Sequence, residues 1–284
     1  MPPDIILFEP TRLFAGPGNH IKIPHIELAW KEFDPKAYIA QAVAELTAVS
    51  KAVTGPLYVG LSGGIDSAVT FGLCARARQT TGLIMFDVWD TPEEARAKEW
   101  FKQLNAEGHP VQMQQVRPQH ITDALTKVVP LKYLKASQRA KGTLPTRSEQ
   151  RVVGNMTARA RMLILYAWAN QHDGLVVGTG NACELYLGYF TKWGDGAADV
   201  LPLRHLLKSQ VYAVARELGV PQSIMDAAPS AGLWAGQTDE QELGVTYAQV
   251  EAYLHGDEVD FQTADVIEHL HQASLHKQPR SWWD

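Results

Sequence analysis

A glycine turn that contains an acid is the part of this chain best suited to chemistry. Residues 57–67 read LYVGLSGGIDS, an apolar run followed by a Ser-Gly-Gly turn, Asp66 and a second serine. The two glycines let the backbone turn sharply and approach a ligand without a Cβ in the way. Because residues 65–77 have a helical pattern, the N–H groups and the positive dipole end of a helix would face this turn. The pattern favours a bound pyrophosphate, with Asp66 as an oxygen ligand for an accompanying Mg²⁺.

A second set of polar residues lies between 178 and 208, in a stretch whose apolar content predicts burial. Glu184 follows a predicted strand by a few residues and has apolar neighbours, so its ionised side chain would need a partner. A metal ion shared with Asp66 would supply that partner, although a glutamate on the surface of a helix is also consistent with the sequence. Lys208 opens a helix, where its charge opposes the helix dipole, and this favours a phosphate partner over a solvated position.

Alternating strands and helices must hold these residues in place. Strands are predicted at 57–61, 82–88, 111–116 and 174–179, and helices at 35–53, 65–77, 91–106, 119–128 and 154–171. Thr91 with Glu94 forms a capping-box pattern at the start of one of these helices. The order predicts an α/β fold with a parallel sheet and helices on both faces. Ligands bind at the carboxyl ends of such strands, where the glycine turn and Thr179 both fall.

Three further segments have less definite patterns. Residues 4–8 are consistent with a short strand, and residues 9–34 are irregular and rich in proline, glycine and aromatic residues. The basic, polar residues 130–152 are consistent with a solvated linker or with a flap that closes over an anionic substrate. We expect a single domain overall, with an N-terminal arm and helix at 1–54 and the main domain at 55–284.

The composition argues against several classes of protein. The 284 residues are 45% hydrophobic and carry a formal charge of −5, which argues against a surface that coats nucleic acid. The sequence has no apolar run long enough to cross a bilayer, and its N-terminus lacks the basic start of a secretory signal. Cys74 and Cys183 form no disulfide or metal-binding pattern and are expected to be small buried side chains. We expect a soluble, cytoplasmic protein without nucleic-acid or membrane partners.

Several blocks of sequence occur in a characteristic order. They are the SGGxDS turn, GNxxARxRM at 154–162, GTxNxxE at 178–184, GYFTKxGDGxxDxxPLxxLxK at 188–208, PSAGLWxGQTDExELG at 229–244 and HK at 276–277. Over about residues 55–280 the chain resembles ammonia-dependent NAD synthetase, a family within the N-type ATP pyrophosphatases. The resemblance implies a Rossmann-like sheet of the adenine nucleotide alpha hydrolase-like fold and a homodimer. It also implies an enzyme that uses Mg²⁺ and ATP to amidate deamido-NAD with ammonia.

The resemblance implies roles for individual residues. Those that would hold ATP are Gly60, Leu61, Ser62, Gly63, Gly64, Ile65, Asp66, Ser67, Thr179, Lys208 and Ser230. Those that would contact deamido-NAD are Arg159, Lys192, Asp199, His276 and Lys277, and those that would bind Mg²⁺ are Asp66 and Glu184. Arg159 shares a helix face with Met156 and Leu163, so we expect it to be half-buried and to have an anionic partner.

The chemistry implied by the resemblance is adenylation of a carboxylate, followed by attack of ammonia. Asp66 and Lys208 are the expected catalytic residues, because charge builds on the phosphates as pyrophosphate leaves. Asp199, also expected to be catalytic, or Asp195 is a candidate to take up a proton from ammonium. The mechanism needs no side chain as a covalent nucleophile, and free ammonia or ammonia from a separate protein is the expected nitrogen source.

Two segments depart from the family pattern. Residues 83–97 lack an arginine directly after the strand, where the family has one that helps to seat adenine. The substrate helix has Gln150, Arg151, Val153 and Thr157 in place of an aspartate, a phenylalanine and two lysines. Two alternatives therefore stay open. One is the same adenylation applied to a different carboxylic acid. The other is a nucleotide-binding protein that no longer catalyses. The presence of Asp66, Glu184 and Lys208 argues against this second alternative.

Overall fold

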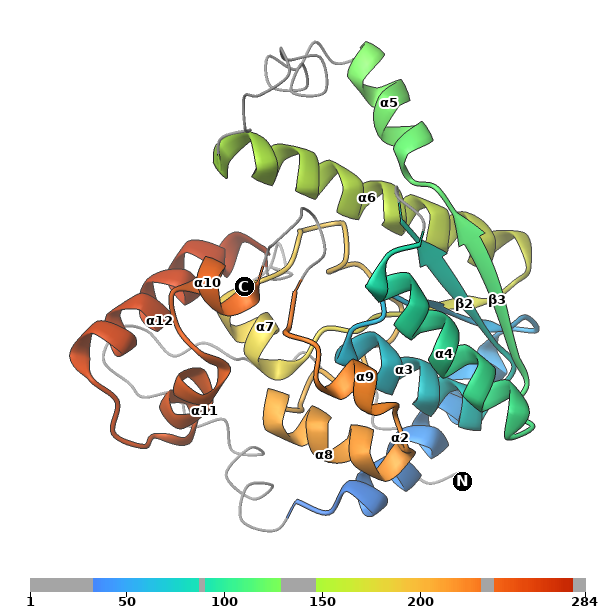
Figure 1. Cartoon of the computed structure of the whole chain (residues 1–284), viewed down its shortest axis with the longest axis horizontal. Helices are drawn as coiled ribbons and strands as arrows, with labels where there is room; N and C mark the ends of the chain where they lie inside the picture. The colour runs from blue at the N-terminus through green and yellow to red at the C-terminus, as the bar shows by residue number, and fades with distance from the viewer. Residues whose placement is uncertain (1–32, 87–89, 129–146, 231–237, 278–284) are drawn as a thin grey trace. The chain divides into compact units, whose positions relative to one another are not determined.

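Four parallel strands form the sheet that positions the candidate residues (Figure 1). In the computed structural model, the strands are β1 (Leu57–Gly60), β2 (Thr80–Met85), β3 (Val111–Val116) and β4 (Leu175–Val177). They lie in the order β3-β2-β1-β4, and Leu57 of β1 is opposite Thr80 on one side and Leu175 on the other. The strand order reverses beside β1. The carboxyl ends of β1 and β4 therefore mark the place where open sheets of this kind bind ligands.

The structure describes residues 33–86, 90–128, 147–230 and 238–277. The chain divides into a unit at Met1–Asp34 and a larger unit at Pro35–Asp284, which holds the sheet. The larger unit includes the helix that the sequence prediction grouped with an N-terminal arm, and the division at 1–54 and 55–284 stays a prediction. The predicted strand at 4–8, nearly all of the segment 9–34 and most of the basic segment 130–152 lie outside the described residues.

Helices cover both faces of the sheet, as the alternating pattern predicted. The helices of these layers are α2 (Pro35–Val49), a 3-10 turn at Ser50–Ala52, α3 (Ile65–Ala77), α4 (Pro92–Ala106), α5 (Gln119–Val128), α6 (Arg147–Gln171) and α8 (Lys208–Leu218). α6 packs on one face against β1 and β4, with α5 beside it, whereas α3 and α4 pack on the other face (Figure 1). α2 and α8 pack against α3 and against each other.

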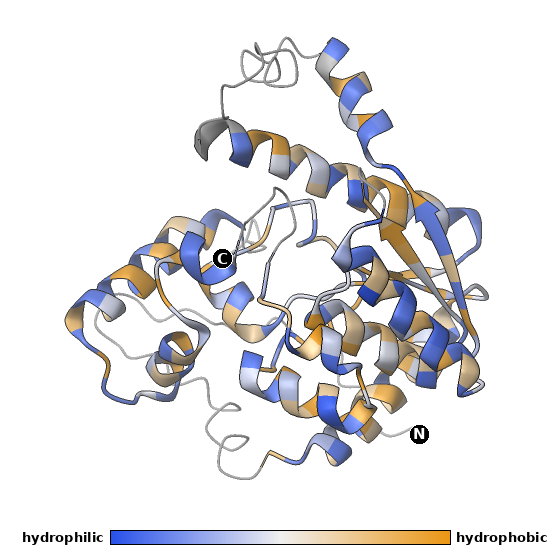
Figure 2. Cartoon of the chain, in the orientation of Figure 1, coloured by the Kyte–Doolittle hydropathy of each residue, from blue (hydrophilic) through white to orange (hydrophobic). Residues whose placement is uncertain are grey.

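Alternate strand residues build the core between α6 and the sheet. The buried side chains of this layer are Tyr58, Leu83, Met85, Ile164, Ala169 and Val176. Gly82, next to Leu83, faces the opposite side, where an added Cβ would lie 3.1 Å from the ring of Phe71 in α3. This is the period of two expected of strands that are covered on both faces. Figure 2 shows the end of β2 as hydrophobic, whereas the edge strand β3 mixes hydrophilic and hydrophobic residues.

The remaining helices come from the C-terminal part of the chain. They are α7 (Ala182–Leu187), α9 (Gln222–Met225), α10 (Asp239–Leu243), α11 (Tyr247–His255), α12 (Phe261–Ser274) and a 3-10 turn at Leu275–Lys277. α11 contacts α7, α8 and α12, and α7 also contacts α12 (Figure 1). The contact between α11 and α8 matters for the site, because both helices begin there.

Most predicted elements are confirmed, and the largest error concerns α6. α3, β3 and α5 have the predicted bounds, whereas α6 begins at Arg147 instead of residue 154. The first five of the added residues, 147–151, are all polar or charged, so they show no apolar period from which a helix could be predicted. The strands predicted at 82–88 and 174–179 are β2 and β4, which both end earlier than predicted; residues 87 and 88 lie outside the described residues.

The predicted capping box at the start of α4 forms only in part. Thr91 Oγ1 accepts a hydrogen bond from the Glu94 N–H at 3.2 Å, as predicted. The Glu94 carboxylate, however, accepts from the Asp90 N–H at 2.6 Å and pairs with Lys98. It also accepts from Gln115 of β3 at 2.6 Å, so this acid ties α4 to the sheet rather than closing a box.

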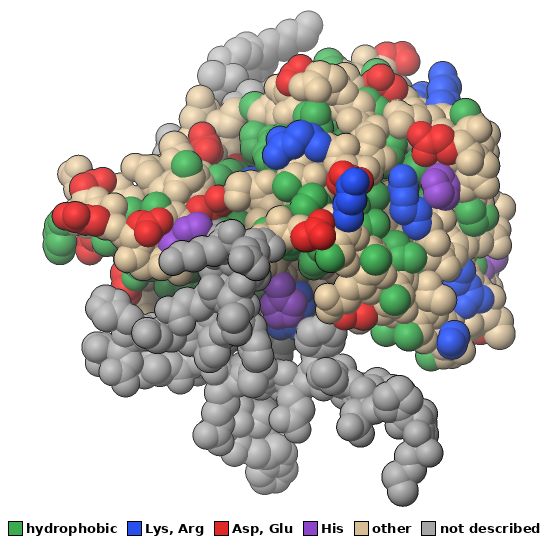
Figure 3. All heavy atoms as spheres, turned by 90° about the horizontal axis from the view of Figure 1, so that it is seen from below, with side chains coloured by type: hydrophobic (Ala, Val, Ile, Leu, Met, Phe, Trp, Pro, Cys, Tyr) green, Lys and Arg blue, Asp and Glu red, His purple; other side chains and the backbone are tan. Residues whose placement is uncertain are grey.

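The cysteines and the surface agree with the composition. Cys74 and Cys183 are both buried, as predicted, and burial raises the pKa of the Cys183 thiol to about 12. On the right-hand part of the face shown in Figure 3, described basic and acidic side chains are interspersed, whereas the left end shows acidic side chains without Lys or Arg. Within the described ranges, no helix combines the length and apolar character needed to cross a membrane.

Candidate functional site

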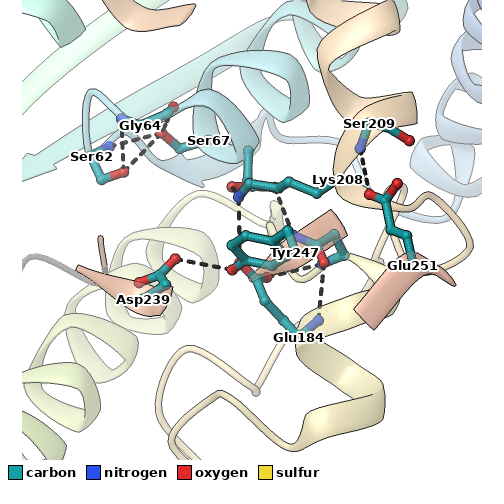
Figure 4. A network of polar contacts seen from close by, with 11 residues as sticks. Ser62, Gly64, Ser67, Glu184, Lys208, Ser209, Asp239, Tyr247 and Glu251 are labelled. Carbon is teal, nitrogen blue, oxygen red and sulfur yellow. Dashed lines mark hydrogen bonds and ion pairs between the residues drawn. The ribbon is translucent and has the colours of Figure 1, made fainter. Parts of the chain in front are cut away.

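The glycine turn after β1 is held in shape by its own serines. The Ser62 N–H donates to Ser67 Oγ at 3.2 Å, and Ser67 Oγ donates to the Gly64 carbonyl oxygen at 2.9 Å. Ser62 Oγ lies 3.0 Å from Ser67 Oγ and accepts from the Gly64 N–H at 3.3 Å (Figure 4). Gly64 is the N-cap of α3 and provides no side-chain cap for the first N–H groups of that helix. This arrangement suits an anion at the start of α3.

Gly63 occupies a backbone position that only glycine fits. Its φ is +77°, and an added Cβ would lie 2.1 Å from the Glu93 carbonyl oxygen. Arg96 of α4 donates from Nε to the Gly63 carbonyl oxygen at 3.0 Å. The turn is therefore fixed against the start of α4 as well as by its serines.

Asp66 and Glu184 meet at a single buried lysine. Asp66 Oδ2 accepts a hydrogen bond from Lys208 Nζ at 2.5 Å, and Glu184 Oε1 lies 3.8 Å from the same Nζ. The side chain of Lys208 is 4% exposed, and those of the two acids are each 17% exposed. In this structure the partners of Lys208 are thus carboxylates, and its contact with a phosphate stays a prediction.

Asn181 connects the two acids through the start of α7. Its Oδ1 accepts from the Glu184 N–H at 3.0 Å, and Glu184 Oε2 accepts from the Asn181 N–H at 3.1 Å, which is a reciprocal capping box. Asn181 Nδ2 also donates to Asp66 Oδ1 at 2.9 Å. Glu184 therefore faces the interior, and the alternative of a glutamate on the surface of a helix is wrong.

Tyr247 and Asp239 complete this group. Lys208 Nζ lies 4.8 Å from the centroid of the Tyr247 ring, a cation–π contact. Tyr247 OH donates to Asp239 Oδ2 at 3.0 Å and lies 3.5 Å from Glu184 Oε1 (Figure 4). We call Asp66, Glu184, Lys208, Asp239 and Tyr247 the charged cluster.

Each member of the charged cluster lies in the first turn of a different helix. Asp66 belongs to α3, Glu184 to α7, Lys208 to α8, Asp239 to α10 and Tyr247 to α11. The N-terminal end of a helix carries partial positive charge, which stabilises nearby acids and phosphates. The packing of these helices therefore creates a place where several anionic groups can lie close together.

The charges of the cluster perturb one another. Burial, together with the charge of Asp66, raises the pKa of Glu184 to about 8. Burial also raises the pKa of Asp239. Burial by itself would lower the pKa of Lys208, but the neighbouring Asp66 and Glu184 outweigh it, so the pKa of Lys208 is raised. The acids exceed the positive charge available from Lys208, and a further cation would relieve their repulsion.

A second site is a cavity of about 490 Å³ between α6, the loop after α7 and the end of α12. Four of the five residues predicted to contact the acid substrate line it: Arg159, Lys192, His276 and Lys277. Arg159 donates from Nε and Nη2 to the Lys192 carbonyl oxygen, each at 3.2 Å. Lys192 Nζ in turn donates to the His276 carbonyl oxygen. The structure thus groups these four side chains around one cavity.

Asp199, the fifth predicted contact, is not among the described residues that line this cavity. Its Oδ2 accepts from the Val176 N–H at 2.8 Å, and its Oδ1 accepts from Tyr166 OH at 3.2 Å. One carboxylate oxygen therefore contacts β4, and the other contacts α6.

The structure places three other predicted residues as follows. Thr179 follows β4 by two residues and is half-buried, and Ser230 is exposed directly before residues 231–237, which lie outside the described part. Arg159 is exposed rather than half-buried. The prediction was wrong because the helix face that Arg159 shares with Leu163 is not in the core: Leu163 itself is 50% exposed.

Sequence reasoning assigned no role to Asn181, Asp239 or Tyr247. Asn181 could have been found, because Asn-x-x-Glu before an apolar run is the pattern of a capping box. Asp239 and Tyr247 carry no comparable local signal. They meet only because α8, α10 and α11 begin at the same place.

Comparison with known proteins shows relatives along most of the chain. Residues 36–280 match the family model described as NAD synthase. The NH(3)-dependent NAD(+) synthetase of Mannheimia succiniciproducens is 42% identical, over 77% of this chain and 83% of that protein. The protein of the same name from Alkaliphilus metalliredigens is 38% identical, over 89% of this chain and 96% of its own length.

Solved structures share the fold. The NMN synthetase of Francisella tularensis matches with a TM-score of 0.75 and 39% identity, over 88% of this chain and 98% of that one. The NH3-dependent NAD synthetase of Campylobacter jejuni, solved in complex with nitrate, matches with a TM-score of 0.68 and 25% identity, over 88% and 99% of the two chains.

The parallel sheet, the glycine turn and the charged cluster define an α/β enzyme of the adenine nucleotide alpha hydrolase-like fold, as the resemblance implied. More narrowly, the chain belongs to the NAD synthase family.

Proposed function

We propose that this chain catalyses the ATP-dependent amidation of deamido-NAD to NAD, with ammonia as the nitrogen source and with AMP and pyrophosphate as the other products. The observation that carries the proposal is the convergence of Asp66, Glu184 and Lys208 beside the glycine turn at the carboxyl end of β1. Membership of the NAD synthase family supports the choice of acid, because relatives carry the name NH(3)-dependent NAD(+) synthetase.

The ATP phosphates bind at the glycine turn. The residues assigned to them are Gly60, Leu61, Ser62, Gly63, Gly64, Ile65 and Ser67, with Thr179 and Ser230 as further contacts to ATP. The helix dipole at the start of α3 and the absence of a side-chain N-cap at Gly64 support this assignment. Lys208, which is hydrogen-bonded to Asp66, supplies positive charge beside the turn.

Asp66 and Glu184 are the residues that would hold Mg²⁺. The raised pKa of Glu184 reflects burial beside a second carboxylate, and hard oxygen donors of this kind are what Mg²⁺ prefers. Among the described residues, no three His, Cys, Asp or Glu side chains form a metal-binding group. This agrees with Mg²⁺, which is usually held by one or two carboxylates together with phosphates and water. When bound, the ion neutralises charge on the phosphates.

The reaction proceeds in two steps. The carboxylate of the acid attacks the α-phosphorus of ATP, so that an acyl–AMP bond forms and pyrophosphate leaves. Ammonia then attacks the acyl carbon, the bond to AMP breaks with its electron pair, and the nitrogen loses a proton. Lys208 stabilises the charge that develops on the phosphate oxygens, and Asp66 holds the side-chain ammonium group of Lys208 in position.

The group that accepts the proton stays a prediction. The candidates are Asp199 and Asp195, each of which already accepts hydrogen bonds from the protein. Asp199 accepts from Val176 and Tyr166, and Asp195 Oδ1 accepts from the Thr191 N–H at 3.0 Å.

The acid substrate binds in the cavity beside α6. Arg159, Lys192, His276 and Lys277 line this cavity, and the positive charge of the arginine and the lysines suits a phosphate-containing substrate. The backbone contacts of Arg159 and Lys192 orient both side chains before the substrate arrives.

A second candidate differs only in the acid. The Francisella tularensis neighbour is named NMN synthetase, and amide formation that yields NMN would start from nicotinic acid mononucleotide. The departures from the family pattern at Gln150, Arg151, Val153 and Thr157 lie on the helix that lines the substrate cavity. The adenylation and amidation steps would be unchanged.

The direct test mixes the protein with Mg²⁺, ATP, ammonium and either acid, and measures the nucleotide amide and AMP. We expect stoichiometric amide and AMP formation. Binding of ATP without release of pyrophosphate would contradict the proposal and would favour a protein that binds nucleotides without catalysis.

A homodimer in the cytoplasm is also part of the proposal, because the resemblance implies a dimer. Sedimentation analysis of the purified chain would test the oligomeric state.

A further inference from the structure

One face of α6 presents three polar side chains to the substrate cavity. Arg151, Asn155 and Arg159 are spaced four residues apart, so they lie one above another on the helix, and all three line the cavity. Arg159 was expected to contact the acid substrate, whereas Arg151 and Asn155 have no assigned role.

The three side chains differ in how firmly the protein holds them. Arg159 donates twice to the Lys192 carbonyl oxygen, and Asn155 Oδ1 accepts from Thr191 Oγ1 at 2.8 Å. Arg151 is exposed and has no hydrogen bond or ion pair with another residue of the described part. Its guanidinium group therefore keeps its hydrogen-bonding capacity for a ligand.

Arg151 also adds positive charge to a cavity that already has an excess of it. Lys277 Nζ donates to the carbonyl oxygens of Gly188 and Phe190 at 2.6 and 2.7 Å, so it is fixed at the wall. Burial is the main cause that lowers the pKa of Lys277; the charge of Asp195 opposes it, and the charge of Arg151 adds a smaller lowering effect. Lys277 and Arg151 thus repel each other, and an anion between them would be stabilised by both.

We propose that Arg151 binds the terminal phosphate of a mononucleotide acceptor, so that this chain amidates nicotinic acid mononucleotide. The proposal rests on the ATP-dependent amidation proposed above. In the balanced reaction, the acid and ATP give acyl–AMP and pyrophosphate, and ammonia then gives the amide, AMP and a proton.

The chemistry of a terminal phosphate explains why Arg151 would distinguish the two acids. A phosphate monoester carries about 1.5 to 2 negative charges near pH 7 and three free oxygens, which a planar guanidinium group binds through two parallel hydrogen bonds. In the diphosphate of a dinucleotide, each phosphorus carries a single charge and is bonded onward to another group. Loss of Arg151 should therefore harm the mononucleotide more than the dinucleotide.

The test compares both acids in the wild-type protein and in Arg151→Gln, Arg151→Lys and Lys102→Gln. Lys102 is an exposed cation on α4, on the other face of the sheet, and serves as the matched loss of charge. Initial rates of AMP release give kcat and KM for each acid at saturating ATP and ammonium. Thermal denaturation confirms that each variant is folded, and calorimetric titration with nicotinic acid mononucleotide measures binding independently of turnover.

We expect the wild-type protein to amidate the mononucleotide. Arg151→Gln should lower kcat/KM for this acid by about 10- to 100-fold, mainly through KM, as for the loss of a hydrogen bond between charged groups. The Kd from calorimetry should rise by a similar factor. The rate with deamido-NAD should change far less, Arg151→Lys should restore part of the loss, and Lys102→Gln should behave as wild type.

Four results would overturn the inference. Amidation of deamido-NAD alone would remove the mononucleotide as a substrate while leaving the proposed function intact. If Arg151→Gln lowered kcat/KM equally for both acids, Arg151 would contact a part of the substrate that the two acids share. Failure to amidate either acid would overturn the proposed function itself, and unchanged calorimetric binding in Arg151→Gln would separately exclude the phosphate contact.

Discussion

The ammonium group of Lys208 lies between acids that come from distant parts of the sequence. Asp66 and Glu184 both lie within 4 Å of it, and Tyr247 covers it with its ring. These contacts keep the buried lysine charged and fix the position of its ammonium group. We propose that this charge stabilises the group that leaves during phosphoryl transfer, so that the positions of a few side chains decide the rate.

Removal of either acid should impair adenylation. We expect Asp66→Asn and Glu184→Gln to lower the rate of AMP release by about 100-fold or more, the cost of one missing electrostatic contact in the transition state. Initial rates at saturating Mg²⁺ and ATP measure the effect. Turnover close to wild type in either variant would contradict their assignment as Mg²⁺ ligands.

Tyr247→Phe separates the hydroxyl group from the ring. The ring would still cover Lys208, but Asp239 Oδ2 and Glu184 Oε1 would lose the hydroxyl beside them. We expect the free energy of unfolding to fall by about 1–3 kcal/mol, because a buried acceptor loses its donor, together with a loss of kcat. Urea denaturation and initial rates measure the two effects. Tyr247→Leu, which also removes the ring, should cost more in both, and equal behaviour of the two variants would argue against the cation–π contact.

The raised pKa of Glu184 predicts how stability depends on pH in metal-free buffer. Its carboxyl group has a pKa of about 8 in the folded protein, against 4.5 as its ordinary value. The folded state therefore binds the proton more tightly than the unfolded state, and the stabilisation is present below pH 4.5 and is lost as the pH rises through 8. Thermal denaturation between pH 5 and about 9 should show a smaller decline in Glu184→Gln than in wild type. Parallel declines would show that Glu184 titrates normally.

At the scale of elements, the site is a meeting point of helix ends. The glycine turn leads into α3, and α7, α8, α10 and α11 each bring one side chain of the charged cluster in their first turn. Asn181 both caps a helix and holds a side chain of the site. Its capping box ends the loop before α7, and its amide nitrogen holds Asp66.

Gly63→Ala tests whether the shape of the glycine turn matters. The left-handed backbone should cost about 1–2 kcal/mol for any residue with a Cβ, and the close approach to Glu93 adds a clash. We expect lower thermal stability and a higher KM for ATP. Gly108→Ala is the matched control, because its φ of +84° is similar and an added Cβ would meet nothing within 4 Å. If both variants lose the same stability and keep the same KM, the turn does not depend on its contact with α4.

Local patterns predicted the elements better than they predicted the site. The apolar period gave α3, β3 and α5 with their observed bounds, and Thr91 was recognised as a helix cap. The polar start of α6 offered no such period. Arg159 was expected to be half-buried because helical spacing shows which residues share a face, and it cannot show which face meets the core.

At the scale of the whole larger unit, the strand order decides which distant residues can meet. The reversal beside β1 places the carboxyl ends of β1 and β4 side by side, so that Asp66 and Asn181, which follow them, can touch. The sequence motifs indicated that Asp66 and Glu184 belong to one site. The inclusion of Tyr247 and Asp239, and the separation of Asp199 from the substrate cavity, depend on tertiary packing and have no signal in the local sequence.

Exchange of labelled pyrophosphate into ATP tests the central claim most directly, because it reports formation of the acyl–AMP bond without the ammonia step. The protein is incubated with Mg²⁺, ATP and labelled pyrophosphate, with and without an acid acceptor, and ammonia is omitted. We predict that label enters ATP only when deamido-NAD or nicotinic acid mononucleotide is present, and that Asp66→Asn abolishes the exchange. Amide formation by the same preparation without any acid-dependent exchange, or undiminished exchange in Asp66→Asn, would contradict the account.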